Sequence, residues 1–505
     1  MARYLAELSR EINRQIGILV SRSGNIEVVM VGDSHSIVIP SLSEYREGVG
    51  RLRGLRCIHT HLGGEPLTED DLTDLALLRL DIMGSISVMP DGSAGLIHSA
   101  HLLPKPIEEK NILQLDPAMP SQMDFDVSAL VQSVEEEIAR DASLMDVLPK
   151  GDRAFLISVT TGSRGSAEES LDELKELAST AGVQVFDTIV QRRDRIHHKY
   201  IMGKGRLGEL LIRAMQKSAN LLVFDNELNA SQIRSITDFT DMRVIDRTQL
   251  ILDIFAQHAR SREGKIQVEM AQLKYMLPRL VTRDDALSRL TGGIGGRGPG
   301  ETRLEIDRRR VHERIVRLAK DLKGVSKQRE LRRKRRNRKE MPVISIVGYT
   351  NAGKSTLLNA LTHSHFLAED RLFATLDPAS RRLRFPRDSE AIITDTVGFI
   401  RNLPKDLFQA FKATLEELQD ADMILHLIDI SSEKFRDHME AVERILEDLD
   451  LHNVPTMKVF NKTDLVSKDH VKSQCRIYRA LSVSAIDPAT LGPLIDGVES
   501  MLLKT

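Results

Sequence analysis

Short apolar runs alternate with amphipathic stretches along the chain, most regularly between residues 151 and 260. Ser166 to Glu169 form a capping box, and Leu171, Leu174 and Leu177 line one face of the helix that it begins. Strands that alternate with helices over short connections predict a small parallel sheet covered by helices. The predicted strands are 155–160, 183–190, 221–225 and 242–246, and the predicted helices are 166–182, 205–218, 229–240 and 250–258.

The first 103 residues show a less regular pattern that also predicts an α/β domain. Two stretches have helical periodicity, Tyr4–Gln15 and Leu72–Asp81. The predicted strands are 16–21, 26–31, 36–40, 56–61, 85–90 and 95–98. Residues 104–150 begin with a proline-containing, weakly patterned segment, and we interpret them as a linker followed by a helix.

Residues 261–340 have the seam of a helical hairpin. Apolar residues recur at spacings of three and four in both halves: Ile266, Met270, Leu273, Leu277 and Leu280, then Leu304, Val311, Ile315, Leu318, Leu322 and Val325. A glycine-rich loop, Thr291–Thr302, connects them, and Lys327–Lys339 holds nine Lys or Arg and one Glu. A basic, glycine-tipped hairpin is typical of a surface that contacts RNA phosphate, although a plain connector and a solvated helix face are the alternatives.

Composition restricts the setting more than the function. The formal net charge is −2 and 41% of residues are hydrophobic, so the chain as a whole is an ordinary globular one. Two distant cysteines imply no disulfide framework, and no apolar run is long enough for a signal peptide or a membrane span. We therefore expect a cytoplasmic, monomeric protein with no membrane partner.

The strongest chemical motif begins the last domain, residues 341–505. A β-branched run, Val343–Val347, leads into Gly348-x-x-x-x-Gly353-Lys354-Ser355, and a helical pattern follows. This strand–loop–helix arrangement predicts a phosphate-binding loop, whose backbone N–H groups surround phosphate oxygens. The residues expected to contact the nucleotide here are Gly348, Asn351, Ala352, Gly353, Lys354, Ser355 and Thr356, with Lys354 neutralising the outer phosphates.

Two further segments predict a Mg²⁺ site and a nucleotide-dependent switch. The strand Ile392–Thr394 ends in Asp395-Thr-Val-Gly398, so Asp395 and Ser355 would hold Mg²⁺ and the Gly398 N–H would sense a γ-phosphate. Thr375 is the candidate switch threonine and a third Mg²⁺ ligand. Phe399 stands where related enzymes place a glutamine that orients water, which predicts slow intrinsic hydrolysis.

The base is specified by Asn461-Lys462-Thr-Asp464 after a strand. The Asp464 carboxylate can accept both the N1–H and the 2-amino group of guanine, a pair that adenine does not offer. Asn461 would brace the loops, Lys462 would lie along the base, and Ser484 and Ala485 would support the guanine O6 through the backbone. The four ordered motifs together indicate GTP.

Residues from about 150 to 505 resemble the HflX family of ribosome-associated GTPases. The resemblance rests on the βα module, on the loop from Gly292 to Thr302 and on Asp395-Thr-Val-Gly-Phe399. It implies GTP/GDP and Mg²⁺ as cofactors, catalytic roles for Lys354, Thr375 and Gly398, and the large ribosomal subunit with its RNA as partner. It also implies splitting or rescue of stalled ribosomes; a GTPase of subunit assembly or RNA maturation shares every nucleotide motif.

The N-terminal domain has its own candidate site. His59 and His61 alternate on a strand and so point to one face, and Asp71 lies in the first turn of the next helix, a set that can bind Zn²⁺. The segment resembles a degenerate JAMM/RadC-like domain, with Thr68 in the place of a serine and no acidic residue near Gly17. Helix capping by Thr68 is the competing interpretation, and a metal-dependent protease with a regulatory GTPase is the remote alternative.

Taken together, the patterns predict a multidomain α/β protein. It would combine an N-terminal α/β domain, a small parallel α/β domain with a helical hairpin, and a P-loop GTPase domain built on a doubly wound sheet.

Overall fold

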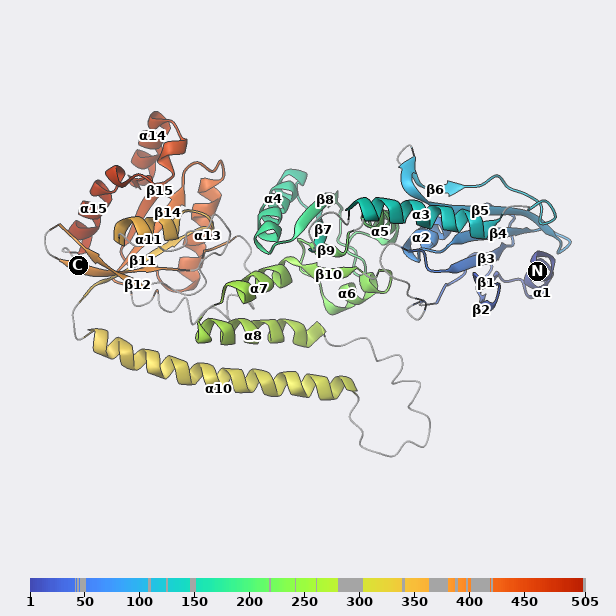
Figure 1. Cartoon of the computed structure of the whole chain (residues 1–505), viewed down its shortest axis with the longest axis horizontal. Helices are drawn as coiled ribbons and strands as arrows, with labels where there is room; N and C mark the ends of the chain where they lie inside the picture. Colours follow the sequence, from blue (N-terminus) through green and yellow to red (C-terminus); the bar gives the residue numbers. More distant parts are fainter. Residues whose placement is uncertain are drawn as a thin grey trace. The chain divides into compact units, whose positions relative to one another are not determined.

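The computed structural model describes most of the chain. The described residues are 1–40, 42, 45, 51–107, 110–123, 126–145, 151–217, 219–240, 242–259, 261–279, 303–337, 341–362, 380–386, 389–396, 398–400, 418 and 421–502. They fall into two compact units, Met1–Arg247 and Thr248–Thr505, which are described separately (Figure 1).

The first unit begins with a six-stranded sheet in the order β2-β1-β3-β4-β5-β6. Only β3 and β4 are parallel neighbours. The strands are β1 (Ile16–Ser21), β2 (Ile26–Val31), β3 (Leu55–His61), β4 (Ile82–Val88), β5 (Ala94–Ile107) and β6 (Lys110–Gln114). Helix α1 (Ala2–Ile12) packs through Leu5 and Ala6 on one face. Helices α2 (Glu69–Leu77) and α3 (Val127–Met145) pack on the other, because alternate strand residues point to opposite faces.

Two details differ from the sequence-based expectation. Residues 36–40 form no strand. Residues 104–107 and 110–114, predicted as linker, instead lie in β5 and β6, and β6 pairs antiparallel with β5. Prolines at 104 and 106 suppressed the strand prediction, but proline is tolerated where a strand lies near a sheet edge.

The second sheet of this unit is fully parallel, in the order β10-β9-β7-β8. Its strands are β7 (Arg153–Thr160), β8 (Gln184–Arg192), β9 (Leu221–Phe224) and β10 (Arg243–Asp246), and its helices are α4 (Arg164–Thr180), α5 (Lys204–Gln216) and α6 (Ala230–Thr237). The prediction of a small parallel sheet with helices is therefore confirmed.

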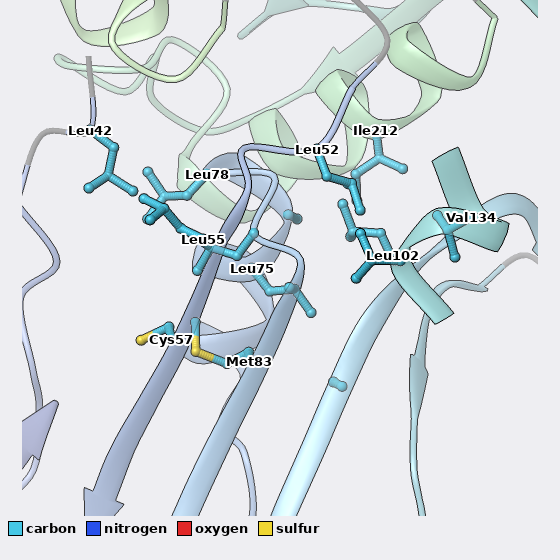
Figure 2. Packing of buried hydrophobic residues seen from close by; sticks show 14 of the residues in the cluster. Leu42, Leu52, Leu55, Cys57, Leu75, Leu78, Met83, Leu102, Val134 and Ile212 are labelled. Atoms are coloured by element: carbon cyan, nitrogen blue, oxygen red, sulfur yellow. The ribbon is translucent and has the colours of Figure 1, made fainter. Parts of the chain in front are cut away.

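Helices α2 and α5 join the two sheets into one unit. A Cβ at Gly208 of α5 would lie 3.5 Å from Leu77 and 3.6 Å from Ala76 of α2, so the helices approach closely. Ile212 of α5 is part of the core under the first sheet, as Figure 2 shows, and so is Met215. Leu77 of α2 is part of the core of the second sheet. Since each core includes residues of the other module, the first 145 residues are packed against the parallel sheet rather than tethered to it.

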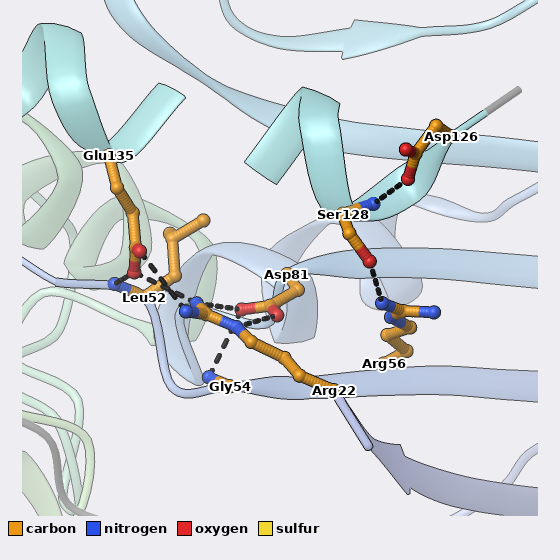
Figure 3. A network of polar contacts seen from close by, with 8 residues as sticks. All are labelled: Arg22, Leu52, Gly54, Arg56, Asp81, Asp126, Ser128 and Glu135. Carbon is orange, nitrogen blue, oxygen red and sulfur yellow. Dashed lines mark hydrogen bonds and ion pairs between the residues drawn. The ribbon is translucent and has the colours of Figure 1, made fainter. Parts of the chain in front are cut away.

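A polar network fixes α3 against the first sheet (Figure 3). Arg22 donates to both carboxylate oxygens of Asp81, at 2.6 and 2.9 Å, and to Glu135 of α3 at 2.8 and 3.1 Å. Asp81 is buried, and it also accepts the Gly54 N–H at 3.0 Å. One guanidinium thus bridges a buried and a partly exposed carboxylate.

The second unit contains a helical hairpin. Helix α7 (Arg247–His258) precedes α8 (Arg262–Met276), and a short 3-10 helix, η2 (Leu277–Arg279), follows α8. Ile266 and Met270 of α8 pack on Leu318 of α10 (Arg303–Asn337), as the predicted seam requires. The glycine-rich loop 291–302 and the side chains of the basic run lie outside the described residues.

The GTPase part of this unit has a six-stranded sheet in the order β12-β13-β11-β14-β15-β16. Only β12 is antiparallel to its neighbour. Separate hydrophobic cores on its two faces make it doubly wound, as predicted: α11 and α15 pack on one face, α13 and α14 on the other. The strands are β11 (Val343–Gly348), β12 (Ser380–Arg384), β13 (Glu390–Asp395), β14 (Met423–Asp429), β15 (Thr456–Asn461) and β16 (Leu481–Ser482). The helices are α11 (Lys354–Thr362), α13 (Phe435–Asp448), α14 (Lys468–Tyr478) and α15 (Gly492–Leu502), with 3-10 turns η4 (Thr463–Leu465) and η5 (Pro488–Thr490).

Within the described part of the chain, none of the helices combines the length and the apolarity that crossing a bilayer demands.

Candidate nucleotide site and a second polar cluster

The loop between β11 and α11 has room only for glycine at its two motif positions. A Cβ at Gly348 would lie 2.3 Å from the Leu427 carbonyl oxygen, and one at Gly353 would lie 2.4 Å from Nδ2 of Asn461. Gly353 also has a φ of +89°, which favours glycine. The loop is therefore held against β14 and β15 with its backbone N–H groups available for an anion at the start of α11.

Lys354 is buried at the centre of this loop. Its Nζ donates to the carbonyl oxygens of Gly348 at 3.1 Å and Tyr349 at 2.9 Å. Burial lowers the pKa of Lys354 to about 8, against an opposing effect of Asp395. A phosphate at this position would restore the charged form, because an adjacent anion stabilises an ammonium.

Two hard oxygen donors meet beside Lys354. The Ser355 hydroxyl donates to Oδ2 of Asp395 at 2.6 Å, since β13 pairs with β11 and brings Asp395 opposite Ile346. A hydroxyl and a carboxylate at this spacing are the ligand types that Mg²⁺ prefers. Thr375, the third predicted ligand, lies outside the described residues.

The segment after Asp395 is tied to the phosphate loop by backbone hydrogen bonds. The Thr350 N–H donates to the Phe399 carbonyl at 2.8 Å, and the Phe399 N–H donates to the Gly348 carbonyl at 3.2 Å. A Cβ at Gly398 would lie 2.7 Å from Thr350 Cγ2 and 3.1 Å from Lys354 Nζ. Gly398 therefore lies against Lys354, and Phe399 is buried.

Asn461 connects three loops of the site. Its Nδ2 donates to the Ala352 carbonyl at 2.8 Å, and its Oδ1 accepts the Ala485 N–H at 2.9 Å. The Ser484 hydroxyl donates to Oδ1 of Asp464 at 2.6 Å and so orients the carboxylate assigned to guanine. The structure thus brings together the phosphate-loop, base-reading and Ser-Ala residues that the sequence placed up to 133 positions apart (352 to 485).

Two residues that contact the site, Asp429 and Thr490, were not identified from the sequence. Lys462 has a left-handed backbone and its Nζ lies 2.7 Å from Asp429, the last residue of β14. Thr490 accepts the Ser484 N–H at 3.0 Å. An aspartate at the carboxyl end of a buried strand was the available signal for Asp429; Thr490 carries no pattern of its own.

A second polar cluster lies in the first unit. The two Nε2 atoms of His59 and His61 are 2.9 Å apart, and the Asp71 carboxylate oxygens lie 3.2 Å from His59 and 3.5 Å from His61. Both histidines are buried. Three ligand atoms within 4.8 Å of one another suit a single metal ion.

The surroundings set the chemistry of this cluster. His61 Nδ1 lies 2.9 Å from the Glu65 carbonyl, so Nδ1 carries a proton and Nε2 faces the cluster. Thr68 caps α2 and Asp71 completes a capping box, so the capping interpretation and the convergence with the histidines both hold. Burial opposes ionisation of Asp71, but bonds from His59, His61 and Thr68 outweigh it and hold the pKa of Asp71 well below its usual range.

The Gly203-Lys204-Gly205-Arg206 segment lies at the start of α5. Lys204 Nζ lies 2.6 Å from Asp74 of α2, and Arg206 pairs with Glu209. Both cations therefore already have carboxylate partners within the first unit.

Comparison with known proteins gives three family matches. Residues 168–256 match the family described as GTP-binding GTPase N-terminal, residues 258–336 its middle region, and residues 343–462 the family described as 50S ribosome-binding GTPase. A crystal structure of a GTP-binding protein from Sulfolobus solfataricus in complex with GDP is 22% identical, covering 70% of this chain and 99% of that one with a TM-score of 0.39.

Curated relatives are more similar. GTPase HflX of Escherichia coli K12 is 45% identical over 64% of this chain and 76% of its own length. GTPase HflX of Caldanaerobacter subterraneus subsp. tengcongensis is 46% identical over 369 residues, 73% of this chain and 83% of its own length. With these relatives and the nucleotide site described above, the chain belongs to the HflX family of GTPases and hydrolyses GTP.

Proposed function

We propose that this GTPase depends on Mg²⁺, binds the large ribosomal subunit and acts in the splitting or rescue of stalled ribosomes, with hydrolysis stimulated by the ribosome. The observation that carries the proposal is Phe399. It occupies the place of a water-orienting glutamine; its ring is buried, and its backbone is hydrogen-bonded to the phosphate loop.

A buried phenyl ring has no group that can hold the attacking water. Lys354 and Gly398 can stabilise charge on the transferred phosphate, but the nucleophile lacks a partner on the described residues of this segment. Hydrolysis at a useful rate therefore requires an outside contribution, and the ribosome is the partner that the family description 50S ribosome-binding GTPase suggests.

Ser355 and Asp395 would hold the Mg²⁺ ion, and Thr375 would join them when GTP is bound. When bound, the ion supplies positive charge to the phosphate oxygens. Asp464 would select guanine, with Ser484 orienting its carboxylate and Asn461 fixing the distance between base and phosphate loops.

The partner is tested by cosedimentation of the full chain with purified particles, in the presence of a non-hydrolysable GTP analogue. We expect binding to mature large subunits and to intact ribosomes in the cytoplasmic fraction. Binding restricted to precursor particles would refute the proposal and indicate a role in subunit assembly instead.

We also propose that His59, His61 and Asp71 bind one Zn²⁺ ion. The supporting observation is that three buried or half-buried ligand atoms converge, with the His61 ring oriented by the Glu65 carbonyl so that Nε2 faces the cluster. After dialysis against Zn²⁺ and then buffer, elemental analysis should give about one zinc per chain, and His59→Ala should lose it. The assignment would be refuted if His59→Ala retained zinc or if the wild-type chain held no zinc. His35→Ala, which changes an exposed histidine, serves as the control.

A further inference from the structure

The loop between β8 and α5 carries an exposed group of cations. Arg192, Arg195 and Lys199 are exposed, and among the described residues no carboxylate pairs with any of them. Their neighbours Arg193, Lys204 and Arg206 are engaged, with the Met202 carbonyl, Asp74 and Glu209 respectively. Arg192, Arg195 and Lys199 give this loop three exposed cations against one exposed carboxylate, Asp194, on a chain whose net charge is −2.

Three aromatic rings lie nearly parallel in the same loop. The His198 and His197 ring centroids are 4.8 Å apart at 21°, and those of His197 and Tyr200 are 5.4 Å apart at 18°. Tyr200 is buried and contacts Phe239 at 5.8 Å, so the rings lead from the core to the exposed His198. Proteins also hold unpaired bases by stacking them on aromatic side chains in this way.

The loop holds these rings in a fixed geometry. His197 and Ile201 exchange two backbone hydrogen bonds, at 2.9 and 3.0 Å, and His197 Nδ1 accepts the N–H groups of Lys199 and Tyr200 at 3.2 and 3.1 Å. Ile201 has a φ of +64°, a left-handed conformation that is strained for a β-branched residue. Strain of this kind persists where surrounding contacts fix a loop, and it concentrates at binding sites.

We propose that residues 192–200 form a binding site for single-stranded RNA, in which an unpaired base stacks on His198 and Arg192, Arg195 and Lys199 contact the adjacent phosphates. Cations alone would favour any polyanion, but a rigid ring that ends at an exposed imidazole selects an unstacked planar base. In the cell the RNA would be ribosomal, and that part rests on the proposed ribosomal function.

The test measures binding of the full chain to a fluorescein-labelled dodecauridylate and to a 12-base-pair RNA duplex. The wild type should prefer the single strand. His198→Ala should weaken single-strand binding by about 5- to 20-fold, the lower range of one stacked base, whereas His198→Phe, which keeps an aromatic ring without the imidazole nitrogens, should stay within about 2-fold of wild type. Lys199→Ala should reduce the slope of log affinity against log salt by about 0.7.

His35→Ala is the matched control, because His35 is also exposed in the first unit and lies in a different loop. Equal affinity for duplex and single strand, equal weakening in His198→Ala and His198→Phe, or no effect of His198→Ala would each overturn the site. If the wild type binds dodecauridylate through His198 but does not cosediment with large subunits, the ribosomal function fails and the site stands. If it cosediments but His198→Ala leaves dodecauridylate binding unchanged, the site fails and the ribosomal function stands.

Discussion

Replacing Asn461 by alanine removes the brace between the phosphate loop and the base-reading loops. The Asn461 side chain is only 1% exposed, and it satisfies the Ala352 carbonyl and the Ala485 N–H, both of which are buried. Alanine leaves both groups without a partner, and each such group costs about 1–3 kcal/mol. We therefore expect the free energy of local opening at this site to fall by about 2–6 kcal/mol.

Hydrogen exchange of the amides in residues 348–362 and 456–485 measures this change, because exchange reports the free energy of local opening. Exchange in both segments should accelerate by at least about tenfold, since about 1.4 kcal/mol corresponds to a factor of ten. The dissociation constant of a fluorescent GDP analogue should rise by at least about the same factor, because the nucleotide must then order the loops itself.

Asn453→Ala is the control, since Asn453 is exposed in the same GTPase fold and should leave both measurements unchanged. Unaltered exchange in the two segments, together with GDP affinity within about twofold of wild type, would refute the reasoning. A change in exchange without a change in affinity would show that the brace stabilises the fold but is not used for nucleotide binding.

Three other changes have defined outcomes. GTP affinity should fall as pH rises above about 8. Burial lowers the pKa of nucleotide-free Lys354 to about 8, so above that pH the neutral amine has to bind a proton before it pairs with phosphate. Dissociation constants for GTP that are the same at pH 7, 8 and 9 would contradict this. Arg22→Ala should cost about 1–3 kcal/mol of stability, because Asp81 stays buried without its guanidinium; thermal melting indistinguishable from wild type would contradict it. Asp464→Asn should shift preference from GTP to xanthosine triphosphate, and competition assays that still favour GTP would remove the base assignment.

Hydrophobic periodicity predicted the elements whose formation depends on neighbouring residues in the sequence. The βα alternation, the hairpin seam and the strand before Gly348 each follow from periodicity within about 20 residues, and the structure contains all three. Two predictions of strands were wrong: residues 36–40 were predicted as a strand but form none, and residues 104–107 and 110–114 were predicted as linker but lie in β5 and β6. The apolar run Ile37–Ile39 lies in no strand, whereas prolines at 104 and 106 hid the end of β5, and β6 exists through its pairing with β5.

Contacts between distant segments could not be predicted from the local sequence. Nothing in the local sequence around Gly208 predicts that its helix lies against Ala76 and Leu77. The pairing of Lys462 with Asp429 likewise depends on how separate segments meet. The motif residues were recognisable because phosphate and guanine recognition constrain residue types, whereas these contacts constrain only shape.

The proposed zinc site and the proposed RNA-binding loop, residues 192–200, belong to the same unit. His59 and Asp71 lie on β3 and α2, α2 packs on α5, and the basic loop leads directly into α5. Because the two modules share a core, the N-terminal module and the parallel sheet form one packed unit. The resemblance of the N-terminal module to a degenerate JAMM/RadC-like domain stays a prediction.

We propose that the ribosome switches this GTPase on, because Phe399 cannot position water. The direct test is the turnover number for GTP hydrolysis by the full chain, measured alone and with purified large ribosomal subunits at saturating GTP. We predict slow turnover alone and a rise of at least about tenfold with the subunits, a change of about 1.4 kcal/mol in the activation free energy. Equal turnover with and without subunits, at concentrations where cosedimentation shows binding, would contradict the account.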